Sequence, residues 1–184
     1  MSRERFVELM GEAVIGLPRD LKSALRIVED PEVDDESRIA LAGALLHVIS
    51  METSIPGVRG VLQHVGSVIV LRLTVEDAME RSPEKMAGHT SLFPSLEEEL
   101  EVTRAFLGEG LSLLEAVVKS LPAMNHQGHE PKECVMDVDS SKWLYDTVHV
   151  TLVTKLEIDE DDVAREIKGA DHIRKSLLAR AKKA

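Results

Sequence analysis

The side chains best suited to metal binding lie in a polar stretch in the second half of the sequence. His126, His129 and Cys134 follow the spacing H-x2-H-x4-C. Imidazole nitrogens and thiolates are ligands that zinc prefers, but a structural zinc site needs four of them arranged as a tetrahedron. Neither Cys-x-x-Cys nor His-Glu-x-x-His, the patterns that identify such sites, occurs in the sequence. These residues therefore form an incomplete candidate metal site, and we interpret the stretch as a solvated loop.

Two other arrangements of histidine are compatible with ligand binding. Asp146 and His149 are three residues apart, which on a helix places them on one face. A di-iron site in a helical bundle needs two Glu-x-x-His pairs and two further glutamates, so we interpret this pair as a surface feature.

His47 and His64 flank a predicted turn, where they could bind a ligand or titrate near neutral pH. Histidines in such positions more often bond to the backbone or face solvent, and we expect the same here.

The sequence contains none of the common motifs that bind nucleotides or activate a nucleophile: no Walker loop, no G-x-G-x-x-G and no G-x-S-x-G. The acidic run at residues 157–162 lacks the alternating pattern of an EF-hand loop, and a helix N-terminus explains it more simply. We therefore predict no cofactor and a non-enzymatic helical protein with an interaction or regulatory function. The alternative is a metal-dependent helical enzyme that uses histidine and carboxylate ligands.

The charge balance argues against nucleic acid as a partner. The chain has 184 residues, of which 22 are basic and 33 acidic, and a net charge of −11. Such a surface repels phosphate backbones and anionic lipid headgroups. Three Phe, one Tyr and one Trp leave few rings to stack on bases. We interpret a basic stretch at residues 174–183 as cations that complement a helix dipole. The prediction is a protein that binds no nucleic acid.

Composition also bears on the compartment. A single cysteine, Cys134, excludes an internal disulfide and fits a reducing environment. The first residues mix charges with apolar side chains, unlike a secretory signal. No apolar run approaches the ~20 residues needed to span a bilayer. We predict a cytoplasmic protein without a transmembrane segment, whose partner is another protein or a second copy of itself in a homodimer.

Apolar residues recur at steps of three and four along almost the whole chain, which predicts helices. Turn signals near residues 16, 30 and 56 divide the first 79 residues into four helices. Further helices are predicted at about 96–121 and from 159 to the end. Residues 143–158 alternate like a strand but also step by four, and we predict a helix there. The predicted fold is all-α, a compact bundle of six or seven helices.

The chain is predicted to form one structural domain overall. Residues 1–80 make a first helical module, residues 81–91 a linker, and residues 92–184 a set of helices packed on the first module. After the linker, Ser95 and Glu98 have the spacing of a capping box, which predicts the start of the next helix.

That helix, at residues 96–121, carries an apolar seam with coiled-coil spacing. Its 26 residues would span about 39 Å at about 1.5 Å per residue. Gly108 and Gly110 interrupt it, which indicates a kink or a close helix crossing. We interpret the seam as intramolecular core, with a dimer interface as the alternative. The seam consists of Leu107, Leu111, Leu114, Val118 and Leu121.

Residues 17–79 contain several short motifs in a characteristic order. A D-P-x-[VL] turn at residues 30–33 leads into an alanine-rich helix at 42–46. The stretch HVISMETSIPG at 47–57 is similar to Y-L-I-S-P-I-D-L-I-P-D, and VLQHVGS at 61–67 is similar to V-L-G-Y-L-D-D. This order resembles the YkvA-like family, small helical domains of unknown function that are common in bacteria.

The resemblance implies a bacterial helical domain but no established reaction or cofactor. The family's acidic positions fall here on residues without a carboxylate. Whatever those acids do in the family is therefore not carried over to this chain. The four positions are Thr53, Gly57, Gly66 and Ser67.

Overall fold

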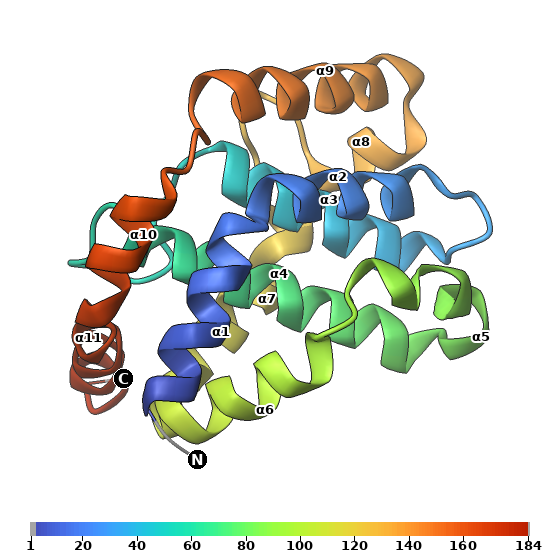
Figure 1. Ribbon diagram of the computed structural model, residues 1–184. Coiled ribbons are helices and arrows are strands. Elements are labelled where there is room, and N and C mark those ends of the chain that lie inside the picture. Colours follow the sequence, from blue (N-terminus) through green and yellow to red (C-terminus); the bar gives the residue numbers. More distant parts are fainter. Residues whose placement is uncertain (1–2, 184) are drawn as a thin grey trace.

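The computed structural model describes residues 3–183, and these residues fold into helices joined by turns (Figure 1). No strand is present in that range, where the one β-type pairing is an isolated bridge between His126 and His129. The all-α prediction is therefore confirmed.

The number of helices was harder to predict than their type. Residues 3–183 contain eleven α-helical segments, so the predicted six or seven are not confirmed. Three of these segments are at most two turns long, and two of the three begin with a proline, which suits the first turn of a helix. The segments are α1 (Arg3–Ile15), α2 (Leu17–Glu29), α3 (Asp35–Ile49), α4 (Val61–Arg81), α5 (Pro83–Met86), α6 (Leu96–Leu107), α7 (Leu111–Ser120), α8 (Pro131–Met136), α9 (Val138–Thr154), α10 (Glu160–Glu166) and α11 (Asp171–Ala181).

The prediction of one continuous helix over residues 96–121 is wrong. α6 ends at Leu107, and a 3-10 turn separates it from α7. Gly108 in this turn has a φ of +54°, a left-handed conformation that ends the helix. The predicted capping box is also wrong, because Ser95 makes no side-chain hydrogen bond to the start of α6. Glu98 instead accepts a hydrogen bond of 2.9 Å from Arg5.

All five residues of the predicted seam are buried within the chain. Leu107 and Leu114 have no exposed surface, and Val118, the most exposed of the five, is 8% exposed. α7 packs against α4 and α11. Gly110 permits this approach, since a Cβ atom there would lie 2.9 Å from the Cβ of Leu177. The chain itself covers the seam, so no second copy is needed to bury it.

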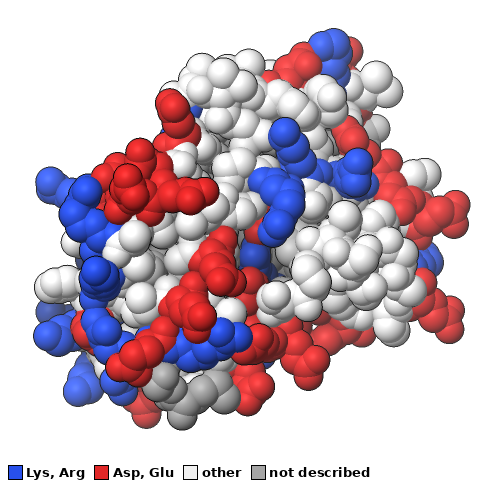
Figure 2. All heavy atoms as spheres, viewed as in Figure 1, with Lys and Arg blue, Asp and Glu red and all other residues white. Residues whose placement is uncertain are grey.

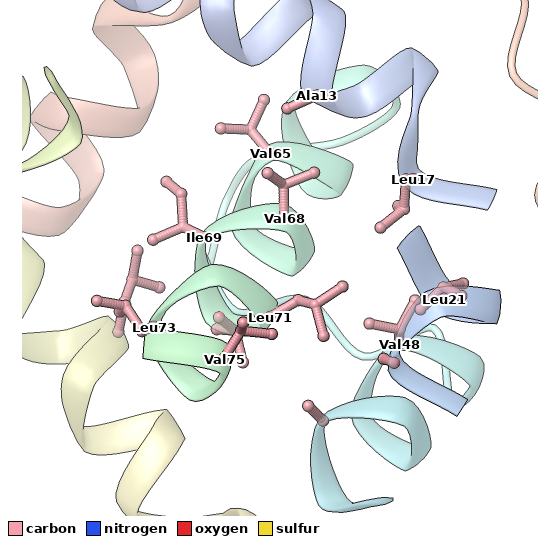
Figure 3. Close-up of a cluster of buried hydrophobic side chains, with 14 of the residues drawn as sticks. Ala13, Leu17, Leu21, Val48, Val65, Val68, Ile69, Leu71, Leu73 and Val75 are labelled. Carbon is pink, nitrogen blue, oxygen red and sulfur yellow. The ribbon is translucent and has the colours of Figure 1, made fainter. Parts of the chain in front are cut away.

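α4 is the central helix of the molecule. Every residue from 65 to 75 is buried, so this segment is covered on all sides, as expected of a helix inside a core. Figure 3 shows Val65, Val68 and Ile69 projecting from successive turns of α4 among neighbouring helices. α1, α3, α6 and α7 all pack against it. The core is built mainly from aliphatic side chains, and the three phenylalanines of the chain are buried in it as well.

α2, α3 and α9 form the part of the fold that contains the candidate site. α2 packs on α3, and α9 lies against both (Figure 1). α2 and α9 are side by side and run in opposite directions, although about 120 residues separate them in the sequence. α9 confirms the prediction of a helix for the ambiguous segment and extends to Thr154.

The segment at residues 81–91, predicted as a linker, is largely helical. It contains the end of α4, α5 and the first part of a 3-10 helix (Ala87–Leu92). Met86 from this segment is fully buried. Between residues 3 and 183, no helix combines the length and apolar character needed to cross a membrane.

Candidate functional site

Three cations project from one face of α2. Arg19, Lys22 and Arg26 are three and four residues apart, and all three are exposed. The opposite face of the helix contains Leu21 and Val28, which are buried in the core. Amphipathic spacing in α2 therefore places a basic row on the surface of an acidic protein.

The basic row forms one wall of a half-open groove of about 430 Å³, which we call the basic groove. The other wall belongs to α9. Figure 2 shows Lys and Arg side chains gathered over α2 near the centre of this face. The volume lies within the ~300–1,000 Å³ range of ligand-binding clefts. The lining residues are Arg19, Lys22, Ser23, Leu25, Arg26, Glu29, Tyr145 and His149.

The charges of the basic groove are poorly balanced within the chain. Arg19 donates hydrogen bonds of 3.2 and 3.3 Å to Asp20 Oδ1. Within residues 3–183, neither Lys22 nor Arg26 has a carboxylate at ion-pair distance. Glu29 is the one acidic residue that lines the groove. The groove therefore presents an excess of positive charge that a negatively charged ligand can compensate.

The wall from α9 adds an aromatic ring and an imidazole. Tyr145 is 45% exposed, and its ring centroid lies 4.2 Å from that of His149. His149 Nδ1 lies 2.8 Å from the backbone carbonyl oxygen of Tyr145. A carbonyl only accepts, so Nδ1 donates and the neutral ring keeps Nε2 as an acceptor. Asp146, which the sequence analysis placed beside His149, instead pairs with Lys142.

A buried ion cluster holds α2 in place beneath the basic groove. Arg72 on α4 is 4% exposed, and its Nε donates a 2.7 Å hydrogen bond to Glu99 Oε2 on α6. Its Nη1 lies 2.7 Å from Asp20 Oδ2, although these two atoms are not aligned as a hydrogen bond, so we treat the contact as an ion pair. Burial alone would lower the pKa of Arg72, but the hydrogen bond to Glu99 and the charge of Asp20 raise it overall.

This cluster fits a structural function better than a catalytic one. The guanidinium of Arg72 lies 5.5 Å from the ring centroid of Phe93, which covers it. The hollow beside the cluster has a volume of about 40 Å³. That is room for one or two water molecules and too little for a substrate. The cluster connects α2, α4 and α6.

The predicted metal residues lie in and beside a turn that precedes α8. His126 and His129 exchange two backbone hydrogen bonds of 3.0 Å, and the ring of His129 stacks on Trp143 with a centroid distance of 3.8 Å. Cys134 is buried in α8, and burial raises the pKa of its thiol to about 11. In the part of the chain that the structure describes, no three His, Cys, Asp or Glu side chains are grouped to hold a metal ion.

The other candidate residues have structural partners. His47 Nε2 lies 2.6 Å from Ser54 Oγ, and both side chains are buried, so His47 does not pair with His64. Asp159 accepts hydrogen bonds from the backbone N–H groups of residues 161 and 162 at the start of α10. The interpretation of the acidic run as a helix N-terminus is thereby confirmed.

The burial of His47 makes stability depend on pH. Burial lowers the pKa of His47 below its ordinary value, against a smaller opposing effect of Glu52. The unfolded chain then binds more protons below about pH 6.5, so acidification favours unfolding. We expect the free energy of unfolding to fall as the pH drops through the ordinary histidine pKa of about 6.5, with up to about 1.4 kcal/mol per pH unit from this residue. In urea titrations, His47→Gln should reduce the slope, and an unchanged slope would contradict this assignment.

The basic groove was not predicted from the sequence, in which the stretch at residues 174–183 was the one candidate basic patch. The signal for one wall is present, because Arg19, Lys22 and Arg26 share the face of α2 opposite its apolar residues. The sequence contains no signal for the other wall, since nothing in it indicates that Tyr145 lies beside α2.

Comparisons of this chain with models of protein families, with curated proteins and with solved structures find no match.

Proposed function

We propose that this chain is a non-enzymatic interaction protein that binds an acidic segment of a partner protein in the basic groove. The observation that supports this most directly is the presence of Lys22 and Arg26, exposed and without ion-pair partners, in a groove of a protein whose net charge is −11. Complementary charges of this kind speed encounter and select the partner.

The composition of the basic groove suits a polypeptide. Arginine forms bidentate hydrogen bonds with carboxylates. Arginine and tyrosine are enriched at protein interfaces, and the groove contains both, Arg19 and Arg26 from α2 and Tyr145 from α9. Nucleic acid is a poorer fit, because a long polyanion would extend beyond three cations onto a mostly acidic surface.

The experiment that tests the proposal compares two variants with the same net charge. Lys22→Glu/Arg26→Glu reverses two cations of the basic groove that have no carboxylate at ion-pair distance among residues 3–183. Lys175→Glu/Arg180→Glu makes the same change on exposed positions of α11. The probe is a fluorescein-labelled peptide of about 15 residues composed of glutamate, leucine and alanine, and binding is read as fluorescence anisotropy.

We expect the wild-type protein and the α11 variant to bind the peptide alike, and the groove variant to bind it at least about tenfold more weakly, or about 1.4 kcal/mol. Equal losses in both variants would show that net charge alone attracts the peptide. Unchanged binding by the groove variant would show that the peptide binds elsewhere. Either result would contradict the proposal.

Three accompanying proposals rest on the sequence. They are a cytoplasmic location, kinship of residues 17–79 with the YkvA-like domains of bacteria, and a second copy of the chain as the alternative partner. The seam gives no support to a homodimer, because its five residues are all buried within one chain. Analytical ultracentrifugation distinguishes a monomer from a dimer without reference to the seam.

A further inference from the structure

Most of the large exposed apolar side chains belong to one segment of the chain, from the end of α8 through α9. Among residues 3–183, six large hydrophobic side chains are exposed, and five of them lie between residues 136 and 153. Val138 is 82% exposed and Val153 is 80% exposed, so solvent surrounds both. Apolar surface gathered in one place, beside a charged groove, is typical of an interaction site.

Part of this apolar surface follows the edge of the basic groove. Val138, Tyr145, His149 and Val153 are separated by seven, four and four residues, which aligns them on one face of α9, and the exposed Lys142, paired with Asp146, lies on the same face between Val138 and Tyr145. We call Val138, Tyr145, His149 and Val153 the α9 row. Tyr145 and His149 from the row line the groove itself. The row extends over about 22 Å at about 1.5 Å per residue. Val150 projects from a different part of the helix.

The α9 row is not needed for the packing of α9 on its own chain. Leu144 and Val148, from the opposite face, are 1% and 0% exposed and anchor α9 to the core. α3 and α8 pack on that side. The exposed row is therefore available to a partner, while the fold of α9 depends on the other face.

The two edges of the groove differ in chemistry. The α2 edge contains Lys22 and Arg26, and the α9 edge contains Tyr145 and His149, with the exposed Val138 and Val153 on the same face of α9 beyond them. An occupant that lies along the groove has to present carboxylates to one edge and apolar side chains to the other. A helix with three- and four-residue spacing can present a stripe of carboxylates and a stripe of apolar side chains on two adjacent faces. An extended strand presents alternate side chains to opposite sides.

We propose that the acidic segment binds as an amphipathic α-helix laid lengthwise along the groove, its apolar stripe on the α9 row and its carboxylates toward Lys22 and Arg26. This rests on the proposed function and specifies the partner's conformation. A helix of about 15 residues matches the length of the row.

An anionic membrane would fit this surface less well. The charged part of the site is a concave groove with Glu29 in its lining, and Asp146 is exposed on α9 beside it. A flat anionic bilayer would also have to approach the acidic residues that surround the groove in Figure 2. A helix confined to the groove avoids them.

The test uses two peptides of identical composition. One places glutamate and leucine at helical spacing, so that they form two adjacent stripes, and the other alternates them with a period of two. The variants are Val153→Ser in the α9 row and Val150→Ser as the matched control, since both valines are exposed positions of the same helix. Fluorescence anisotropy reports affinity, and circular dichroism reports helix formed on binding.

We expect the helical-pattern peptide to bind about tenfold more tightly than the alternating one, and to gain helical ellipticity in the complex. Val153→Ser should weaken its binding about fivefold to tenfold, and Val150→Ser should leave it unchanged. Equal binding of both peptides, with losses only in the Lys22→Glu/Arg26→Glu variant, would overturn the helical inference and leave the proposed function standing. Binding of neither peptide would overturn both.

Two further measurements exclude the other occupants. Vesicles of phosphatidylcholine with phosphatidylserine should not retain the protein in flotation, and retention that Val153→Ser abolishes would assign the row to a lipid surface instead. Sedimentation should give the same mass for the wild type and Val153→Ser. A dimer that this substitution dissociates would assign the row to a second copy and overturn the inference.

Discussion

Replacing Arg72 with methionine is expected to lower the free energy of unfolding by about 3–5 kcal/mol. Methionine retains most of the side-chain volume but removes the cation that Asp20 and Glu99 share, and both carboxylates remain buried. Glu99 then loses its cation, Asp20 keeps only the hydrogen bonds from the exposed Arg19, and the two buried carboxylates repel each other in a low-dielectric site, which is costly. Urea denaturation followed by circular dichroism measures the change.

A variant that removes all the charges separates this effect from lost packing. Arg72→Met/Asp20→Asn/Glu99→Gln leaves no ion in the cluster, so it should recover a large part of the stability lost in the single variant. A loss below about 1 kcal/mol in Arg72→Met, comparable to that of an exposed ion pair, would show that the cluster does not hold α2 to α4 and α6.

Substitution of Leu114 by glutamate is expected to prevent folding. Leu114 has no exposed surface, and it lies on α7 where this helix packs against α4 and α11. The free-energy cost of burying a carboxylate without a partner exceeds the free energy of unfolding of most domains of this size. Leu114→Ala, which leaves a cavity, should cost about 2–5 kcal/mol.

The matched control for this prediction is Ala116→Glu, which introduces the same charge two residues away on the exposed side of α7. Surface changes of this kind usually alter stability by about 0.5 kcal/mol or less. Circular dichroism should show a native spectrum for Ala116→Glu and an unfolded one for Leu114→Glu. A folded, monomeric Leu114→Glu protein would mean that the seam belongs to an interface rather than to the core.

Local signals predicted much of the first half of the fold. α2 ends at Glu29, where the turn signal near residue 30 indicated, because the residue before a proline is disfavoured in a helix. Gly108 was recognised as an interruption of the long predicted helix, but the sequence could not distinguish a kink from a complete break. The difference lies in the left-handed φ of Gly108, in a turn on which α11 packs.

Pairings between distant helices were not predictable. Asp20 reads as an ordinary acid in the first turn of a helix, and Arg72 as a charge within an apolar helix. The fold joins them as a buried ion pair because α2 and α4 meet at that point. The groove has the same origin, since Tyr145 reaches α2 only when α9 packs on α3. One sequence shows periodicity along a helix but not which helices are neighbours.

The central claim is that the groove between α2 and α9 is the site where an acidic partner segment binds. The most direct test is to titrate isotopically labelled protein with the helical-pattern acidic peptide and follow backbone amide chemical shifts. We predict that the largest changes fall on residues 19–29 of α2 and 138–153 of α9. Changes concentrated on the basic stretch at residues 174–183, or no localised changes at saturating peptide, would contradict the claim.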